Sequence, residues 1–156
     1  MHKYLGIMLN YREQGNVKIN MTDYLKTIMD DLPDKYQVRA ITPTTNHLFE
    51  FNETAQKLSK KNTHTLHTIV EKFLFLCKRE WPDILTGVAF LTTRVREPDK
   101  DDAKKFSRML KYISGKSDIV LTLESNGTGT IKWWVDAAFA VHHDMKSHTG
   151  GMMMMG

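Results

Sequence analysis

The chain has very little cysteine, with Cys77 the only one in 156 residues. A single thiol cannot form an internal disulfide or supply the cysteine ligands of a zinc site. No stretch approaches the roughly 20 consecutive apolar residues that a membrane-spanning helix needs. The first residues also lack the charged, apolar and small-residue pattern of a secretory signal. We therefore expect an intracellular protein with no membrane contact, and Cys77 as a small core residue.

Positive charge is unevenly distributed, although the net charge is only +4. Residues 57–116 carry 14 Lys and Arg against 7 Asp and Glu, whereas residues 1–56 sum to −1 and residues 117–156 to −2. Clustered lysine and arginine are typical of a surface that contacts nucleic-acid phosphates, because they displace condensed counterions. A solvated helical surface of mixed charge would give the same composition.

Hydrophobic periodicity predicts an α+β fold. Residues 1–20 alternate as an N-terminal β-hairpin, with one strand from Lys3 to Arg12 and a turn at Gly15. Residues 21–116 place apolar side chains at helical spacing in four stretches, near 21–32, 63–79, 82–95 and 98–113. The segment 34–60 between them lacks strong periodicity. We expect a bundle of about four helices with an irregular connector.

Residues 117–156 are expected to supply strands of a mixed sheet. The predicted strands are 118–124 and 130–136, joined through Asn126-Gly127-Thr128-Gly129, and a third from Ser147 to Met155. The methionines at 152–155 would point to both faces of the sheet, so a buried strand is favoured over a soft-metal site for Cu(I). The unpaired apolar edge of that strand would promote aggregation.

One carboxylate interrupts an apolar run within residues 117–156. The run reads Lys-Trp-Trp-Val-Asp-Ala-Ala-Phe-Ala over residues 132–140, with the acid at Asp136. A buried, unpaired carboxylate is costly, and a metal ion or a dense hydrogen-bond network would remove that cost. Asp136 is therefore a candidate metal ligand. His142, His143 and His148 match no strong zinc spacing and are expected in a solvated turn.

Four motifs, the first of them in two parts, together carry a family resemblance. The segments Asp136-Ala137-Ala138-Phe139-Ala140 and Ser147-His148-Thr149-Gly150 resemble the start of the ribonuclease H domain in copia-type retrotransposon polyproteins. Trp81-Pro82-Asp83-Ile84 is similar to the Arg-Pro-Asp-Ile of that family, and Lys111-Tyr112-Ile113-Ser114-Gly115 to its Lys-Tyr-Leu-x-Gly. Tyr4-Leu5-Gly6-Ile7 looks like the segment that grips the primer after the polymerase palm. Trp81 replaces an arginine and Glu71 a glycine of the family pattern, but order and spacing match over nearly the whole chain.

The resemblance implies three segments: a primer-grip-like hairpin at 1–20, a helical thumb and connection at 21–116, and a truncated ribonuclease H-like sheet at 117–156. Asp136 would be the first catalytic and metal-binding residue of an incomplete site, which holds Mg²⁺ in the intact parent. No cofactor is expected for this chain alone. The polymerase motif Tyr-x-Asp-Asp and the later nuclease carboxylates are missing, so the chain is expected to be inactive alone.

Nucleic-acid contacts are expected from two places. Tyr4 could stack on a sugar or base, and Gly6 would allow close approach to a phosphate. Within the helix near 98–113, a basic stripe of Lys104, Lys105, Arg108 and Lys111 lies opposite Ala103, Phe106, Leu110 and Ile113. Such a stripe would hold a phosphate backbone without reading its sequence.

The favoured function is that of a fragment of a reverse transcriptase and ribonuclease H. In the intact polyprotein it would contact the remainder of that chain and clamp an RNA/DNA hybrid, or another duplex, between the two active sites. Two alternatives stay open. The chain could be an inert remnant of a decayed element with no specific partner, or a small Mg²⁺-dependent nuclease completed by oligomerisation.

Overall fold

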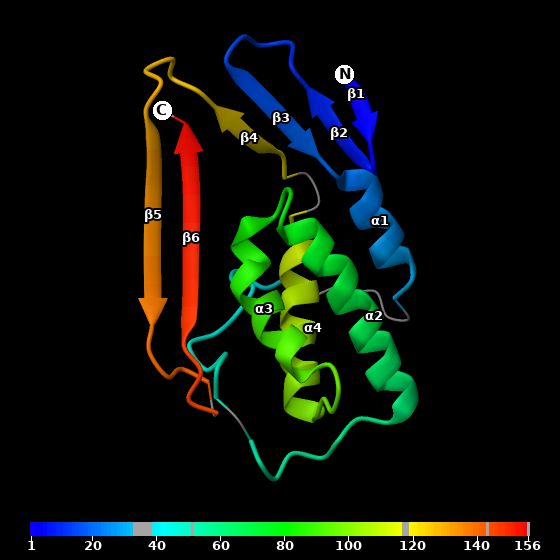
Figure 1. Ribbon diagram of the computed structural model, residues 1–156. Helices are drawn as coiled ribbons and strands as arrows, with labels where there is room; N and C mark the ends of the chain where they lie inside the picture. The colour runs from blue at the N-terminus through cyan, green and yellow to red at the C-terminus, as the bar shows by residue number, and fades with distance from the viewer. Residues whose placement is uncertain (33–38, 51, 117–118, 143, 156) are drawn as a thin grey trace.

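An antiparallel sheet, a helical bundle and a separate two-stranded ribbon make up the computed structural model (Figure 1). It describes residues 1–32, 39–50, 52–116, 119–142 and 144–155. The sheet lies at one end of the bundle, and the ribbon stands beside the bundle. The predicted α+β class is confirmed.

The N-terminal hairpin is present, but its first strand is divided into two. β1 spans His2–Tyr4, β2 spans Ile7–Asn10 and β3 spans Asn16–Asn20, and all three pair antiparallel in this order. Leu5 and Gly6 form a two-residue turn, with φ of 48° and 79°. Both positions lie in the left-handed region, which glycine adopts without steric cost. The prediction of one continuous strand from Lys3 to Arg12 was therefore wrong.

The fourth strand of this sheet comes from far along the chain. β4, Leu121–Glu124, pairs antiparallel with β3, with Leu123 opposite Val17 and Leu121 opposite Ile19. These leucines continue an apolar side of β3 onto β4. The predicted mixed sheet of residues 117–156 was wrong in this respect, since both observed sheets are antiparallel. Residues 117–118 lie outside the described part of the chain.

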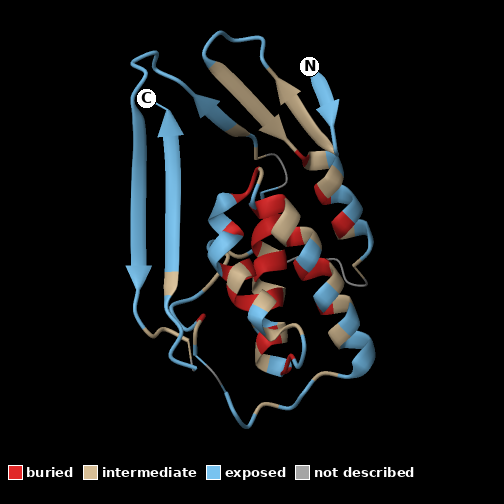
Figure 2. Ribbon diagram, viewed as in Figure 1, coloured by how far each residue is buried: buried red, intermediate tan, exposed pale blue. Residues whose placement is uncertain are grey.

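Four α-helices occur among the described residues, as predicted. They are α1 (Thr22–Asp30), α2 (Lys60–Cys77), α3 (Leu85–Arg94) and α4 (Lys100–Ser114), with a 3₁₀ turn at Pro82–Ile84 before α3. Their inward faces form the core, where buried residues concentrate (Figure 2). The apolar side chains at helical spacing in the predicted stretch 63–79 form the buried side of α2: Leu66, Ile69, Val70, Phe73, Leu76 and Cys77. Burial raises the pKa of the Cys77 thiol to about 11.

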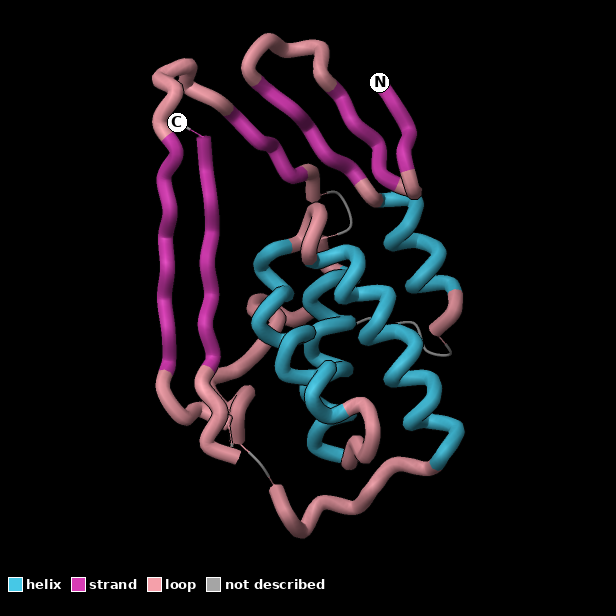
Figure 3. Tube along the Cα trace, in the orientation of Figure 1, coloured by secondary structure: helices cyan, strands magenta, loops and turns pink. Residues whose placement is uncertain are grey.

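The connector expected at 34–60 lacks helices and strands over its described residues before α2 (Figure 3). Its one ladder contact there is an isolated bridge between Lys57 and Asp99. Residues 34–38 and 51 lie outside the described part. The connector contributes Leu48 and Phe49 to the core or its margin, so it is packed although it is irregular.

Trp81, at the start of the Trp-Pro-Asp-Ile segment, belongs to the core. Its side chain is 1% exposed, and its Nε1–H donates to Oε2 of Glu80 at 3.2 Å. The ring also meets Tyr112 edge-on, with 6.5 Å between the ring centroids. A large aromatic residue is therefore accommodated here by packing, and the charge of an arginine is not needed for the fold.

The two-stranded ribbon is exposed on both faces. β5 (Ile131–Ala138) and β6 (His148–Met155) pair over eight residues, and no residue of either strand is buried. The four methionines at 152–155 are 44–56% exposed. The prediction of a buried methionine strand was wrong, because within the described residues nothing covers it. Among all the described residues of the chain, no helix is long and apolar enough to span a membrane.

Candidate nucleic-acid interface

α4 begins at a buried ionic network that fixes its position on α3. Oδ1 of Asp99 accepts hydrogen bonds from the N–H groups of Asp101 and Asp102 at 2.8 and 3.0 Å. Arg94 of α3 reaches both Asp99 and Asp102, each at 3.1 Å. Burial raises the pKa of Asp102, although the hydrogen bond from the N–H of Asp99 and the charge of Arg94 oppose that shift. The cap therefore holds the N-terminal turn of α4, and with it the basic side chains further along.

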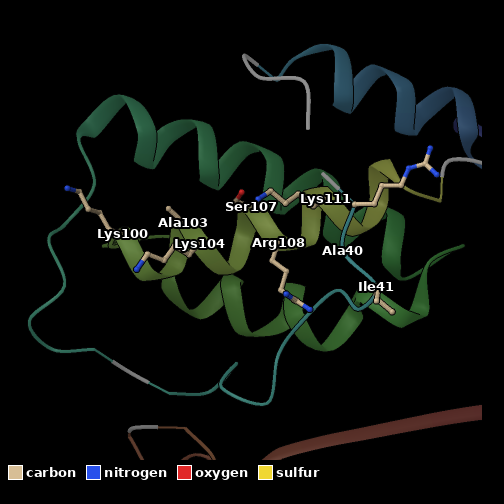
Figure 4. Close-up of a pocket in the computed structure, with 9 residues that line it drawn as sticks. Ala40, Ile41, Lys100, Ala103, Lys104, Ser107, Arg108 and Lys111 are labelled. Atoms are coloured by element: carbon tan, nitrogen blue, oxygen red, sulfur yellow. The ribbon is translucent and has the colours of Figure 1, made fainter. Parts of the chain in front are cut away.

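An open groove with a volume of about 620 Å³ runs along the outer side of α4 (Figure 4). Five of its nine lining residues are basic: Arg39, Lys100, Lys104, Arg108 and Lys111. The other four are Ala40, Ile41, Ala103 and Ser107, so no acid lines the groove. Within the described part of the chain, no carboxylate forms an ion pair with any of the five. The groove therefore presents uncompensated positive charge to an anion.

The connector forms the second wall of this groove. The N–H of Ala40 donates to the carbonyl of Lys111 at 3.3 Å, and Nη2 of Arg108 donates to Oγ1 of Thr42 at 2.8 Å. These two contacts hold residues 40–42 along the C-terminal half of α4. Nε of Arg108 is buried and has no hydrogen-bond partner among the described residues.

Lys105 does not join the groove, although the helical spacing placed it in the basic stripe. Its Nζ donates to the carbonyl of Glu50 at 2.7 Å and lies 3.3 Å from the carboxylate of Asp101. The same nitrogen lies 4.7 Å from the centre of the Phe90 ring. The ammonium group of Lys105 therefore makes its contacts with other residues of the fold and does not face the groove. Ala103, predicted to face inward, lines the groove instead.

The structure keeps Tyr4 and Gly6 apart from this groove. Tyr4 ends β1 with 65% of its surface exposed, and neither residue lines the groove. Gly6 has a structural use, because it is the second residue of the tight turn between β1 and β2. Tyr4 remains available for a stacking contact, whereas the conformation of Gly6 is explained without a ligand.

Asp136 lies in the middle of β5, opposite Gly150, with its side chain exposed. Its Oδ1 accepts a hydrogen bond from the N–H of Ala137 at 2.9 Å. Among the described residues, no group of three or more His, Cys, Asp or Glu side chains is placed to hold a metal ion. Mg²⁺ sites in proteins use one or two carboxylates together with substrate phosphates or waters. A single exposed carboxylate does not fit the two-cation chemistry of a ribonuclease H, so we derive no metal-dependent step from it.

His142 and His148 lie in an aromatic cluster at the base of the ribbon. Their rings are 5.1 and 5.5 Å from Phe49 of the connector, centroid to centroid, and Phe49 meets Phe90 of α3 at 5.8 Å. Both histidines are half-buried, so the prediction of a solvated turn was wrong for them. His143 lies outside the described residues. The cluster is where the ribbon attaches to the bundle.

Two groove cations were missed in the sequence. Lys100 precedes Lys104 by four residues on the same helix, so extending the stripe by one turn would have found it. Arg39 carries no such signal, because it lies in the irregular connector, 61 residues before Lys100. Comparison with protein-family models, with curated proteins and with solved structures gives no match.

Proposed function

We propose that this chain binds the phosphate backbone of double-helical nucleic acid in the groove along α4. The observation that carries the proposal is the grouping of five cations, from two segments distant in sequence, in one groove without an acid. Lysine and arginine side chains of this kind bind phosphates through counterion release, without selecting a sequence. The groove has no aromatic lining residue, so base stacking contributes nothing within it.

We propose that this chain derives from a copia-type reverse transcriptase and ribonuclease H polyprotein. The four motifs in register support this origin, and the groove lies in the segment 21–116 that the resemblance assigns to the thumb and connection. In the intact polyprotein the groove would hold an RNA/DNA hybrid between the two active sites. This chain alone has no assembled catalytic group in its described residues, so its own function is binding.

Binding is tested with a fluorescently labelled RNA/DNA hybrid, by anisotropy at about 50 and 200 mM salt. The variant Lys104→Glu/Lys111→Glu reverses two groove charges. We expect its affinity at low salt to fall on the order of tenfold or more, because two attractive phosphate contacts become repulsive. The control Lys26→Glu/Lys61→Glu makes the same change in net charge at exposed positions of α1 and α2. It should retain most of the wild-type affinity.

Two results would overturn the proposal. Wild-type protein that does not bind the hybrid at low salt would remove the function itself. Equal losses in the groove variant and in the control would show that binding follows net charge and does not occur in this groove.

The exposed ribbon favours a second candidate, an inert remnant of a decayed element. Trp133, Trp134 and Val135 are 66%, 50% and 72% exposed, which is unusual for a folded chain that has its full set of contacts. A remnant would melt over a broad temperature range and bind a hydrophobic dye. A sharp, cooperative melt together with groove-dependent binding would favour the first candidate.

A further inference from the structure

The β5–β6 ribbon has two chemically different faces. Cross-strand partners in an antiparallel pair lie on the same face, and the face alternates along each strand. One face carries Ile131, Trp133, Val135 and Ala137 with their partners Met155, Met153, Gly151 and Thr149. We name these eight residues the uncharged face. The other face carries Lys132, Asp136 and His148 among its eight residues.

The uncharged face lacks a covering layer in the described part of the chain. Ile131, Trp133 and Val135 are 56%, 66% and 72% exposed. A two-stranded ribbon alone in water is marginal, and it becomes stable when an apolar face packs on a further layer. A surface that covers this face would therefore stabilise the ribbon as well as bind to it.

The sizes of the side chains on this face vary along the ribbon. Ile131, Trp133, Met153 and Met155 are bulky and lie at its open end, whereas Ala137, Thr149 and Gly151 are small and lie toward its turn. A two-fold axis across the strands would place the bulky end of one ribbon over the small end of another. Facing layers pack well when large residues meet small ones, so the face complements a copy of itself.

We propose that a second copy of this chain covers the uncharged face, in a two-fold symmetric, sheet-on-sheet contact. The absence of charge on the face argues against nucleic acid as its occupant, and two copies of the face meet without like charges opposite each other. The five large side chains of the face are Ile131, Trp133, Val135, Met153 and Met155. If each buries on the order of 100 Å², two copies together bury about 1,000 Å². That area is at the lower limit of specific interfaces, so the dimer dissociates on dilution.

Sedimentation velocity of the full chain over a concentration series tests this contact. We expect the mass to rise from 18.1 kDa toward twice that value as concentration increases. Trp133→Lys, on the uncharged face, should stay monomeric at every concentration. Trp134→Lys is the matched control, because the neighbouring tryptophan lies on the opposite face; it should dimerise like the wild type. Val135→Lys serves as a second disrupting variant if Trp133→Lys loses its β-structure by circular dichroism.

Three results would overturn the proposal. The wild type could remain monomeric throughout the series. The two tryptophan variants could change association equally, which would indicate nonspecific hydrophobic association through both faces. Assembly could also continue past two copies without a limiting mass, which would indicate pairing of open strand edges and not a closed two-fold contact.

Discussion

The carboxylate of Glu80 accepts a hydrogen bond from the backbone N–H of Met21 at 2.8 Å, across 59 residues of sequence. Met21 lies between β3 and α1, and Glu80 lies between α2 and the 3₁₀ turn, so this one contact joins the sheet to the bundle. Both residues are buried, with exposures of 0% and 1%. The second carboxylate oxygen accepts from Trp81, so both oxygens of Glu80 have a donor.

Glu80 should make stability depend on pH. Burial raises its pKa above the ordinary value of 4.5, against the two hydrogen bonds that lower it. The folded chain therefore holds this proton more tightly than the unfolded chain. The stabilisation is fully present below the unfolded pKa, and it is lost as pH rises through the folded pKa. We expect the free energy of unfolding of the wild type to fall over this window relative to that of Glu80→Gln.

Urea unfolding followed by circular dichroism at a series of pH values measures this difference. Glu97→Gln is the control, because Glu97 is exposed; its pH profile should follow the wild type. Parallel profiles for Glu80→Gln and the wild type would contradict the assignment of the pH dependence to Glu80.

Arg94 should matter more for stability than the capping residue that it contacts. Arg94→Ala would leave Asp99 and Asp102, which are both 2% exposed, without their cation. Breaking a buried ion pair from one side costs about 3–5 kcal/mol. Asp99→Ala removes a helix cap, at about 1–2 kcal/mol, and leaves Arg94 paired with Asp102. We expect urea unfolding to show a larger loss in the free energy of unfolding for Arg94→Ala than for Asp99→Ala. The exposed neighbour Arg96→Ala should have little effect, and equal losses in all three variants would refute this ranking.

The turn between β1 and β2 offers a stabilising substitution. Leu5 has φ of 48°, which a leucine rarely adopts, and its side chain is 67% exposed, so it contributes little to the core. Asparagine tolerates this conformation, and Asn-Gly is the preferred pair for a two-residue hairpin turn. We expect Leu5→Asn to raise the free energy of unfolding by a few tenths to about 1 kcal/mol. Gly6→Val should lower it, and a Leu5→Asn variant of reduced stability would show that the side chain of Leu5 is needed.

The helices could be predicted from sequence because their signals are local. Apolar residues at helical spacing, such as Leu66, Ile69 and Phe73, predicted a helix over 63–79, where α2 lies. The same kind of spacing over 98–113 predicted α4. The sheets could not be predicted in the same way. The pairing of β4 with β3 joins residues more than 100 positions apart and depends on which apolar strands meet in space.

The candidate site was predicted in part for the same reason. Lys104, Arg108 and Lys111 share a helix face, and helical periodicity found them. The same periodicity placed Lys105 with them, because spacing does not reveal that the carbonyl of Glu50 lies within its reach. The exposure of the ribbon could also not be predicted from the sequence. An apolar run predicts burial, but it does not show whether a covering layer exists.

Lys104 and Lys105 are neighbours of the same chemical type that should differ in their contribution to nucleic-acid binding. Lys104 lines the groove without an ion pair among the described residues, whereas Nζ of Lys105 donates to the carbonyl of Glu50 and Lys105 does not line the groove. On duplex nucleic acid, the logarithm of the binding constant falls with the logarithm of salt by about 0.9 for each neutralised phosphate. We expect Lys104→Ala to reduce this slope by roughly one unit.

Lys105→Ala should leave the slope unchanged, even if it lowers stability slightly. Anisotropy titrations of a labelled hybrid across a salt series give both slopes, and thermal melting shows that each variant is folded. A smaller slope for Lys105→Ala than for Lys104→Ala would place the phosphate contacts on the flank of Glu50 and Phe90, and would exclude the groove as the binding surface.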